Sequence, residues 1–125
     1  MKHLLDVNVL LAAIWAHHPR HSEAFAWLEG KKVVLCPLSE LGFLRISAHK
    51  KAMGIPMEKA RRGLATFRKE RDATWIAADL PALDSAAESS EQVTDHYLAD
   101  LAAKHGHKLA TLDEGINHAS VEIIR

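Results

Sequence analysis

The sequence predicts an α/β domain built on a mostly parallel sheet of about five strands. Short and almost continuous apolar runs, such as KVVLC, alternate along the chain with longer segments whose apolar residues recur at helical spacing. Continuous apolar runs are typical of strands that are covered on both faces, which is the usual environment of a parallel sheet. The chain has 125 residues, 48% of them hydrophobic, which is enough to bury one core.

The first third of the chain is expected to hold two strands and two helices. HLLDVN (3–8) is expected to form a buried strand, with a helix over NVLLAAIWA (8–16) directly after it. A second helix is expected from Ser22 to Glu29, ended by Gly30, because glycine readily adopts the left-handed conformation found at helix ends. The second buried strand is expected over KVVLC (32–36).

The middle of the chain is predicted to be mainly helical. One helix is expected over residues 37–54, with Pro37 in its first turn, where the missing N–H of proline is tolerated. Another is expected over residues 55–72, on the helical spacing of Met57, Ala60, Leu64 and Phe67. A third strand, more weakly marked, is expected over ATWIAAD (73–79).

The last third is expected to add one long helix and two strands. The helix covers residues 89–106, with Gly106 at its end, and is followed by strands over KLATLD (108–113) and SVEIIR (120–125). No repeat, low-complexity tract or linker divides the chain, so residues 1–125 are expected to form a single domain.

Charge is balanced overall but unevenly distributed. Sixteen Lys and Arg residues match sixteen Asp and Glu residues, so net charge neither indicates nor excludes a nucleic-acid partner. Between His49 and Asp72, however, eight basic residues stand against three acidic ones. A basic segment beside an acidic body suits a polyanion held near bound cations, but charge alone favours a solvated helix face of mixed charge.

The single cysteine and the N-terminus indicate a cytoplasmic protein. Cys36 excludes an internal disulfide and is expected to be a small buried core residue. Asp6 and Asn8 interrupt the N-terminal apolar run, which argues against a secretion signal, and no apolar stretch is long enough to span a membrane.

Four acidic residues from distant parts of the chain are expected to converge. Asp6 and Asp113 lie at the C-terminal ends of two predicted strands, and Glu40 and Asp95 lie near the starts of two helices. In an open parallel sheet these strand ends and helix starts meet at one edge, where ligands bind. Clustered carboxylates repel one another unless a cation is present, and Mg²⁺ or Mn²⁺ prefers such all-oxygen ligands. The pattern therefore indicates a metal site able to activate water against a phosphodiester.

Each acid also has a structural explanation. Asp6 and Asp95 could cap the helices that follow them, Glu40 could be stabilised by the dipole of its helix, and Asp113 could be a turn residue. Glu114 directly follows Asp113, so either could supply the last ligand. The histidines of HHPRH (17–21) lack the cysteines and the HExxH spacing of zinc sites, which favours a surface loop or a helix start.

Three motifs together resemble the PIN domain, and most closely the VapC-like toxins of bacterial toxin–antitoxin pairs. They are LLDVNVLLA near the N-terminus, LSELGFLR in the first third, and TDHYLADLAAKHGHKLATLD near the end. The resemblance covers essentially the whole chain in the right order. It implies a three-layer α/β/α fold and a Mg²⁺- or Mn²⁺-dependent endoribonuclease.

The resemblance also implies roles for individual residues. Asp6, Glu40, Asp95 and Asp113 match the family's four metal-binding acids, and Asn8 and Thr111 match supporting polar positions. The expected partners are an RNA substrate, a cognate VapB-like antitoxin and a second copy of the chain. RNA backbone contacts are expected at basic residues of the middle segment and its flank, namely Lys50, Lys51, Arg61, Arg62 and Arg45.

Two other classes of function were weighed on the sequence. A non-catalytic PIN-like module could use the same acids to hold a metal or the arginines of a partner. A receiver domain or haloacid-type phosphatase fits poorly, because the first strand ends in DVNVL rather than in paired acids or DxDxT.

Overall fold

The computed structural model describes residues 1–125 and has a five-stranded sheet at its centre. All four strand pairings are parallel, and the strand order is β3-β2-β1-β4-β5. The strands are β1 (Lys2–Leu5), β2 (Lys32–Leu35), β3 (Thr74–Trp75), β4 (Lys108–Thr111) and β5 (Val121–Ile123). The predicted α/β class and parallel sheet are confirmed.

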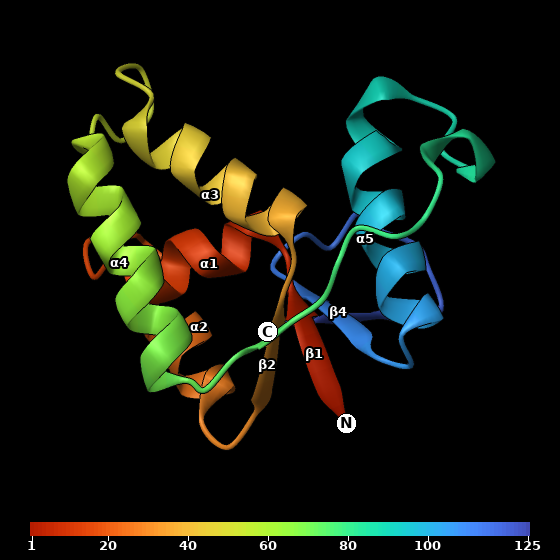
Figure 1. Ribbon diagram of the computed structural model, residues 1–125, viewed down its shortest axis with the longest axis horizontal. Helices are drawn as coiled ribbons and strands as arrows, with labels where there is room; N and C mark the ends of the chain where they lie inside the picture. The colour runs from red at the N-terminus through yellow and green to blue at the C-terminus, as the bar shows by residue number, and fades with distance from the viewer.

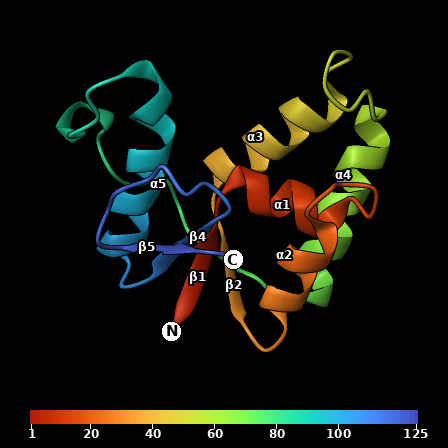
Figure 2. The ribbon, with the colours of Figure 1, turned by 180° about the vertical axis from the view of Figure 1, so that it is seen from behind.

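Helices cover both faces of the sheet, which gives the expected three layers (Figures 1 and 2). Four helices pack on one face and α5 packs alone on the other, against β1 and β4. The helices are α1 (Val7–Ile14), α2 (His21–Leu28), α3 (Pro37–Ala48), α4 (Met57–Glu70) and α5 (Val93–Lys104), with short 3₁₀ turns η1 (Ala82–Asp84) and η2 (Ser90–Gln92). None of these helices has the length and apolar character needed to cross a membrane.

Alternation along the strands divides the core into two clusters. On β1, Leu5 packs into the larger cluster beneath α1 to α4, whereas Leu4 packs into the smaller cluster beneath α5. Because successive strand residues point to opposite faces, consecutive residues of a central strand covered on both sides are buried in different clusters, as Leu4 and Leu5 are. Cys36 is a fully buried free thiol in the smaller cluster, as predicted.

Several predicted boundaries were too generous. The first strand ends at Leu5 rather than at residue 8, because Asp6 takes the extended conformation of a helix N-cap and α1 begins at Val7. The helix expected over 37–54 ends at Ala48. The strand expected over 73–79 has only two residues, since its partner β2 ends at Leu35 and the chain turns into α3 at Pro37.

The strand order of the sheet reverses between β1 and β4. The chain builds β1, β2 and β3 outward in one direction, then returns to place β4 on the other side of β1. Connections leave the C-terminal ends of β1 and β4 in opposite directions, and ligands of open α/β sheets bind at such a reversal. Asp6 follows β1 and Asp113 lies two residues beyond β4, so both acids stand at this point.

Candidate functional site

Asp6 is a buried carboxylate held by two hydrogen bonds. Its side chain is almost inaccessible to solvent, at 4% exposure. The Val7 N–H donates to Oδ1 at 2.7 Å, and the Thr111 hydroxyl donates to Oδ2 at 2.8 Å. Burial raises the pKa of Asp6 above its ordinary value, the two hydrogen bonds lower it, and the negative charge of Asp113 raises it further. Asp6 therefore caps α1 as the sequence allowed, and it also faces a second carboxylate.

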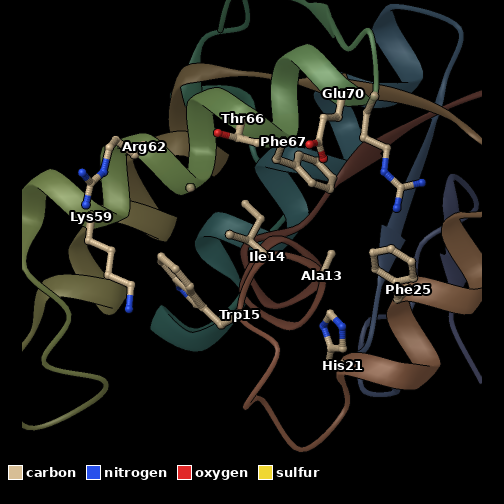
Figure 3. Close-up of a pocket in the computed structure, with 12 residues that line it drawn as sticks. Ala13, Ile14, Trp15, His21, Phe25, Lys59, Arg62, Thr66, Phe67 and Glu70 are labelled. Carbon is tan, nitrogen blue, oxygen red and sulfur yellow. The ribbon is translucent and has the colours of Figure 1, made fainter.

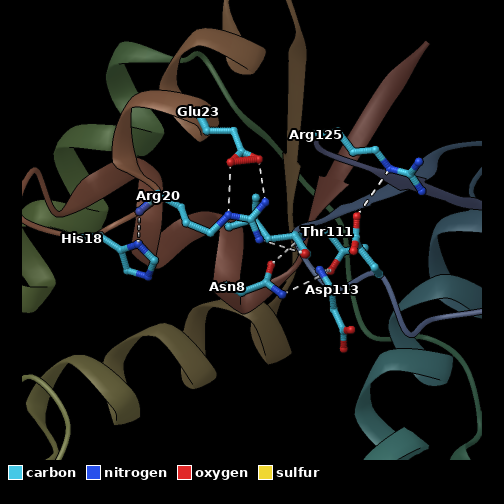
Figure 4. A network of polar contacts seen from close by, with 9 residues as sticks. Asn8, His18, Arg20, Glu23, Thr111, Asp113 and Arg125 are labelled. Atoms are coloured by element: carbon cyan, nitrogen blue, oxygen red, sulfur yellow. Dashed lines mark hydrogen bonds and ion pairs between the residues drawn. The ribbon is translucent and has the colours of Figure 1, made fainter.

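The Thr111 hydroxyl links Asp6, Asn8 and Asp113, and Figure 4 shows its contacts with the last two. It donates to Asp6 and accepts from the Asn8 side-chain amide at 3.2 Å and from the Asp113 N–H at 3.1 Å. The one donor hydrogen and the two acceptor lone pairs of the Thr111 hydroxyl are thus all used. The Asn8 Oδ1 atom accepts in turn from the Leu112 N–H at 3.1 Å. Asn8 and Thr111, for which the resemblance implied supporting roles, together join the start of α1 to the end of β4.

Asp113 is exposed and presents its carboxylate at the rim. The Gly115 N–H donates to its Oδ1 at 2.8 Å, which closes a tight turn directly after the acid. The neighbouring Glu114 instead approaches the guanidinium of Arg125 at 3.7 Å. Of the two adjacent acids, Asp113 is the one whose charge acts on Asp6 and Asp95.

Asp95 lies in the first turn of α5, and its pKa shows the largest shift among the acids of the site. Burial, followed by the charges of Asp6 and Asp113, raises its pKa to about 6, with His96 acting weakly in the opposite direction. Asp95, His96 and Asp113 line a hollow of about 220 Å³. No lysine, arginine or histidine forms an ion pair with Asp6, Asp95 or Asp113. These three carboxylates repel one another without a compensating cation.

Glu40 is engaged differently from the other three acids. It lies in the first turn of α3 beside Ser39, whose buried hydroxyl donates to the Leu5 carbonyl at 2.8 Å and so fixes the helix start against the end of β1. Its Oε1 accepts from the indole N–H of Trp75 at 2.9 Å, and its Oε2 lies 3.5 Å from Arg68 Nη1. Glu40 therefore stands near the site but is neutralised by Arg68. No three Asp, Glu, His or Cys side chains lie close enough to one another to enclose a metal ion.

Arg20 is a site neighbour that the sequence did not indicate. It lies in the connection between α1 and α2, and its guanidinium donates to the Leu112 carbonyl at 3.1 Å, one residue before Asp113 (Figure 4). Glu23 holds the same guanidinium through two contacts. Because Arg20 and Asp113 are far apart in the sequence, no local sequence pattern connects them.

The basic residues predicted to contact RNA do not touch the acids. All five are exposed, and Arg62 lies 3.9 Å from Glu58 one helical turn away. Lys50 and Lys51 follow the C-terminal end of α3 at Ala48, which lies about 12 Å along the helix from Glu40 at 1.5 Å per residue. Arg45 and Lys51 border a separate hollow of about 420 Å³. Among the four predicted acids, Glu40 does have a basic neighbour, Arg68. Arg68 belongs to the basic segment, but the sequence did not single it out from the other basic residues there.

A larger groove lies away from the acids, between α1, α2 and α4 (Figure 3). Its volume is about 580 Å³, and it combines aromatic and apolar side chains with basic ones. The lining includes Trp15, Phe25, Phe67, Lys59, Arg62 and Arg71. None of the four predicted acids borders it.

The HHPRH histidines have structural contacts. His21 begins α2 and its Nδ1 lies 2.7 Å from the Ala12 carbonyl, while His18 Nδ1 accepts from the Arg20 N–H at 3.1 Å. No zinc-like cluster forms there. The expectation of a surface loop and helix start is confirmed.

Comparisons with known proteins agree with this architecture. The family model of the PIN domain matches residues 3–122. Ribonuclease VapC38 of Mycobacterium tuberculosis is 34% identical over 121 residues, covering 90% of this chain and 86% of its own. Ribonuclease VapC44 of the same species is 34% identical over 126 residues, covering 93% and 89%.

A solved structure shares the fold. VapBC2 from Rickettsia felis, bound to a DNA fragment from its promoter, superposes with a TM-score of 0.65 at 17% identity, over 98% of both chains. The strand order, the position of Asp6, Asp95 and Asp113 at the reversal of that order, and the sequence matches lead to the same conclusion. The chain belongs to the PIN-domain family and is a relative of the VapC ribonucleases.

Proposed function

We propose that this protein is a Mg²⁺- or Mn²⁺-dependent endoribonuclease that acts as the toxin of a toxin–antitoxin pair. The observation that carries the proposal is the group formed by Asp6, Asp95 and Asp113. The charge of Asp113 raises the pKa of Asp6, the charges of Asp6 and Asp113 raise the pKa of Asp95, and no basic side chain forms an ion pair with any of the three. Such an arrangement is unfavourable in isolation and becomes favourable when a divalent cation binds.

The donor set fits a hard divalent cation. Carboxylate oxygens are the ligands that Mg²⁺ and Mn²⁺ prefer, and the site offers neither thiolate nor a histidine cluster that would select zinc. We assign the cation to Asp6, Asp95 and Asp113, with Glu40 as a fourth acid. A cation bound there supplies a water of lowered pKa and positive charge that offsets the charge developing on the attacked phosphate.

The other residues of the site orient these acids. The Thr111 hydroxyl holds Asp6 Oδ2, and the amide of Asn8 holds the backbone of β4 that carries Asp113. Because both side chains bridge α1 and β4, they keep two acids from distant parts of the chain at a constant separation. Arg20 reinforces the same strand end through Leu112.

The RNA strand is proposed to approach along exposed basic side chains. Lys50, Lys51, Arg61, Arg62 and Arg45 are all solvent-exposed and supply positive charge along α3, α4 and the turn between them. Such contacts act on the phosphate backbone and give affinity without sequence selection.

A cognate antitoxin is proposed to occupy the groove between α1, α2 and α4. Phe25 is 51% exposed at its edge, and Lys59, Arg62 and Arg71 border it. A segment with apolar side chains and acidic flanks complements this lining. The same segment would reach the acidic site through an arginine or lysine. Replacing Asp95 by Asn is therefore expected to weaken antitoxin binding as well as cleavage.

A homodimer is also proposed. Leu41, beside Glu40, is 61% exposed, and Val93, two residues before Asp95, is 49% exposed. Apolar side chains flanking a polar site are typical of surfaces covered by a partner. Light scattering of the purified chain tests this, and a monomer at all concentrations would contradict it.

The proposed activity is tested by incubating purified, antitoxin-free protein with total bacterial RNA. Discrete fragments are expected with Mg²⁺ or Mn²⁺, and none with EDTA or with Asp95→Asn. Asp100→Asn is the matched control, since it removes a carboxyl group from the same helix at a position that contacts His118 instead of the site. Metal binding without cleavage of any RNA would favour the non-catalytic module.

A further inference from the structure

We propose that Trp75, with Arg68 beside it, is a stacking platform for a base of single-stranded RNA at the edge of the acidic site. The inference rests on the proposed ribonuclease function and adds a substrate-binding residue to it. The basic residues discussed above contact phosphate, whereas Trp75 would contact a nucleobase.

Trp75 is exposed where an aromatic residue would ordinarily be buried. Its exposure is 47%, although it lies in a strand of the central sheet. The other tryptophans are packed: Trp15 is buried and stacks on Phe43, and Trp27 packs edge-on against His3. A large aromatic side chain gains much from burial, so an exposed one beside polar groups is a candidate surface for contact with a ligand.

The position of Trp75 places the ring at the rim that carries the acids. β3 is the edge strand, and Trp75 is in register with Leu35, the last residue of β2. From Leu35 the chain enters α3, whose first turn holds Glu40. The indole N–H donates to Glu40 Oε1 at 2.9 Å. This bond fixes the plane of the ring and places it next to a proposed metal ligand.

The surroundings of the ring carry positive charge. Arg68 Nη1 lies 3.5 Å from Glu40 Oε2, and its side chain remains 48% exposed. Arg68 and Lys69 also line a shallow hollow of about 310 Å³ that includes Ala73, two residues before Trp75. An exposed aromatic face flanked by arginine and lysine matches the way in which proteins bind single-stranded RNA, with bases stacked on rings and phosphates near cations. Charge complementarity thus favours RNA over an apolar protein segment as the occupant.

Stacking must be distinguished from a second role, the positioning of Glu40. Trp75→Phe keeps an aromatic face and loses the N–H that reaches Glu40, whereas Trp75→Ala loses both. Stacking predicts that only the alanine variant binds RNA weakly. Positioning predicts that both variants behave alike. Leu83→Ala is the control, because Leu83 is a large apolar side chain at the surface, 95% exposed, in the 3₁₀ turn η1 and outside the proposed binding contacts.

The experiment measures binding of short oligoadenylate and oligouridylate by fluorescence anisotropy in EDTA, so that no cleavage occurs. Trp75→Ala is expected to lose about tenfold in affinity, and Trp75→Phe less than about threefold, since stacking is worth 1–3 kcal/mol per base. Leu83→Ala is expected to bind as the wild type does. RNA should also quench tryptophan fluorescence in the wild type and not in Trp75→Phe. Circular dichroism melting checks that each variant is folded.

The outcomes separate this proposal from the proposed function. Full affinity of Trp75→Ala, or equal losses in both Trp75 variants, overturns the platform. A loss confined to Trp75→Ala supports it, even if the wild type cleaves no RNA with Mn²⁺ present. That last result would refute the ribonuclease activity and leave an RNA-binding module. Metal-dependent cleavage with undiminished binding by Trp75→Ala would do the reverse.

Discussion

Replacing Thr111 by Val tests how the buried acid of the site is held. Valine has nearly the same shape as threonine, so the packing of β4 is kept while the hydroxyl is removed. The substitution deletes the 2.8 Å bond to Asp6 Oδ2 and the two bonds accepted from Asn8 and Asp113. Because Thr111 is fully buried and Asp6 almost so, water cannot replace the bond to the carboxylate.

The expected loss of stability follows from these contacts. A hydrogen bond to a charged group contributes about 1.5–3 kcal/mol, and burying the extra methyl group of valine returns less than about 1 kcal/mol. The amides of Asn8 and Asp113 lie closer to solvent, so their loss adds little. We expect a decrease of about 2 kcal/mol in the free energy of unfolding near pH 8.

The decrease should depend on pH with a defined sign. The Thr111 bond lowers the pKa of Asp6 in the folded protein, so its removal raises that pKa further. The folded variant then keeps a proton that the unfolded chain has released over a wider range of pH. Its destabilisation must therefore grow as pH rises through the pKa values of Asp6 in the two folded proteins.

Urea denaturation of the metal-free protein between pH 5 and 8 measures this effect. Thr111→Ser is the control, because it keeps the hydroxyl and loses only a methyl group; its stability loss should not vary with pH. A Thr111→Val protein as stable as the wild type, or one whose loss is constant across this range, would refute the reasoning about Asp6.

Three further predictions concern the site and its surroundings. Asp95→Asn should stabilise the metal-free protein at pH 8 by about 1 kcal/mol, with the gain disappearing below about pH 4; the pKa near 6 sets a higher ceiling, but solvent screening reduces it. An Asp95→Asn protein less stable than the wild type at pH 8 in a urea titration would contradict this. Gly42→Ala should destabilise by about 1–2 kcal/mol, because the new Cβ would lie 2.5 Å from Val7 Cγ2, and Val7→Ala should restore part of the loss in thermal melts. Arg61→Glu combined with Arg62→Glu should weaken RNA binding at low salt and leave Mn²⁺ affinity unchanged; unaltered RNA affinity would remove these residues from the interface.

Much of the fold was predictable because its signals are local. The apolar runs of β1, β2 and β4 and the periodicity of α4 and α5 fix the element types, and the alternation of strands and helices fixes the parallel sheet. Boundaries were less predictable. Asp6 lies in an apolar run and looked like part of a strand, but its capping bond to Val7 starts α1 there and the strand ends at Leu5.

The grouping of Asp6, Asp95 and Asp113 was also predictable, because strand ends and helix starts share one edge of a parallel sheet. The engagement of Glu40 was not. Its partners Arg68 and Trp75 are 28 and 35 residues away, and only the packing of α4 and β3 against α3 brings them together. The contact of Arg20 with Leu112 spans 92 residues and is likewise a tertiary effect.

The basic residues assigned to RNA binding show the same contrast between local signals, which the sequence carries, and tertiary contacts, which it does not. Charge counting locates a basic segment between His49 and Asp72. It could not say which of its members lies beside Glu40, since that depends on how α4 packs against α3 (Figure 1). This packing brings Arg68 to Glu40, whereas Lys50 and Lys51 follow the C-terminal end of α3.

The central claim is that three mutually repelling carboxylates form a divalent-cation site. Titration of Mn²⁺ into the metal-free protein at pH 7.5, followed by isothermal calorimetry, tests it most directly. We predict saturable binding by the wild type and by Asp100→Asn, and a loss of at least about tenfold in affinity for Asp95→Asn and for Asp113→Asn. Equal Mn²⁺ affinity in all four proteins, or no saturable binding by the wild type, would contradict the account.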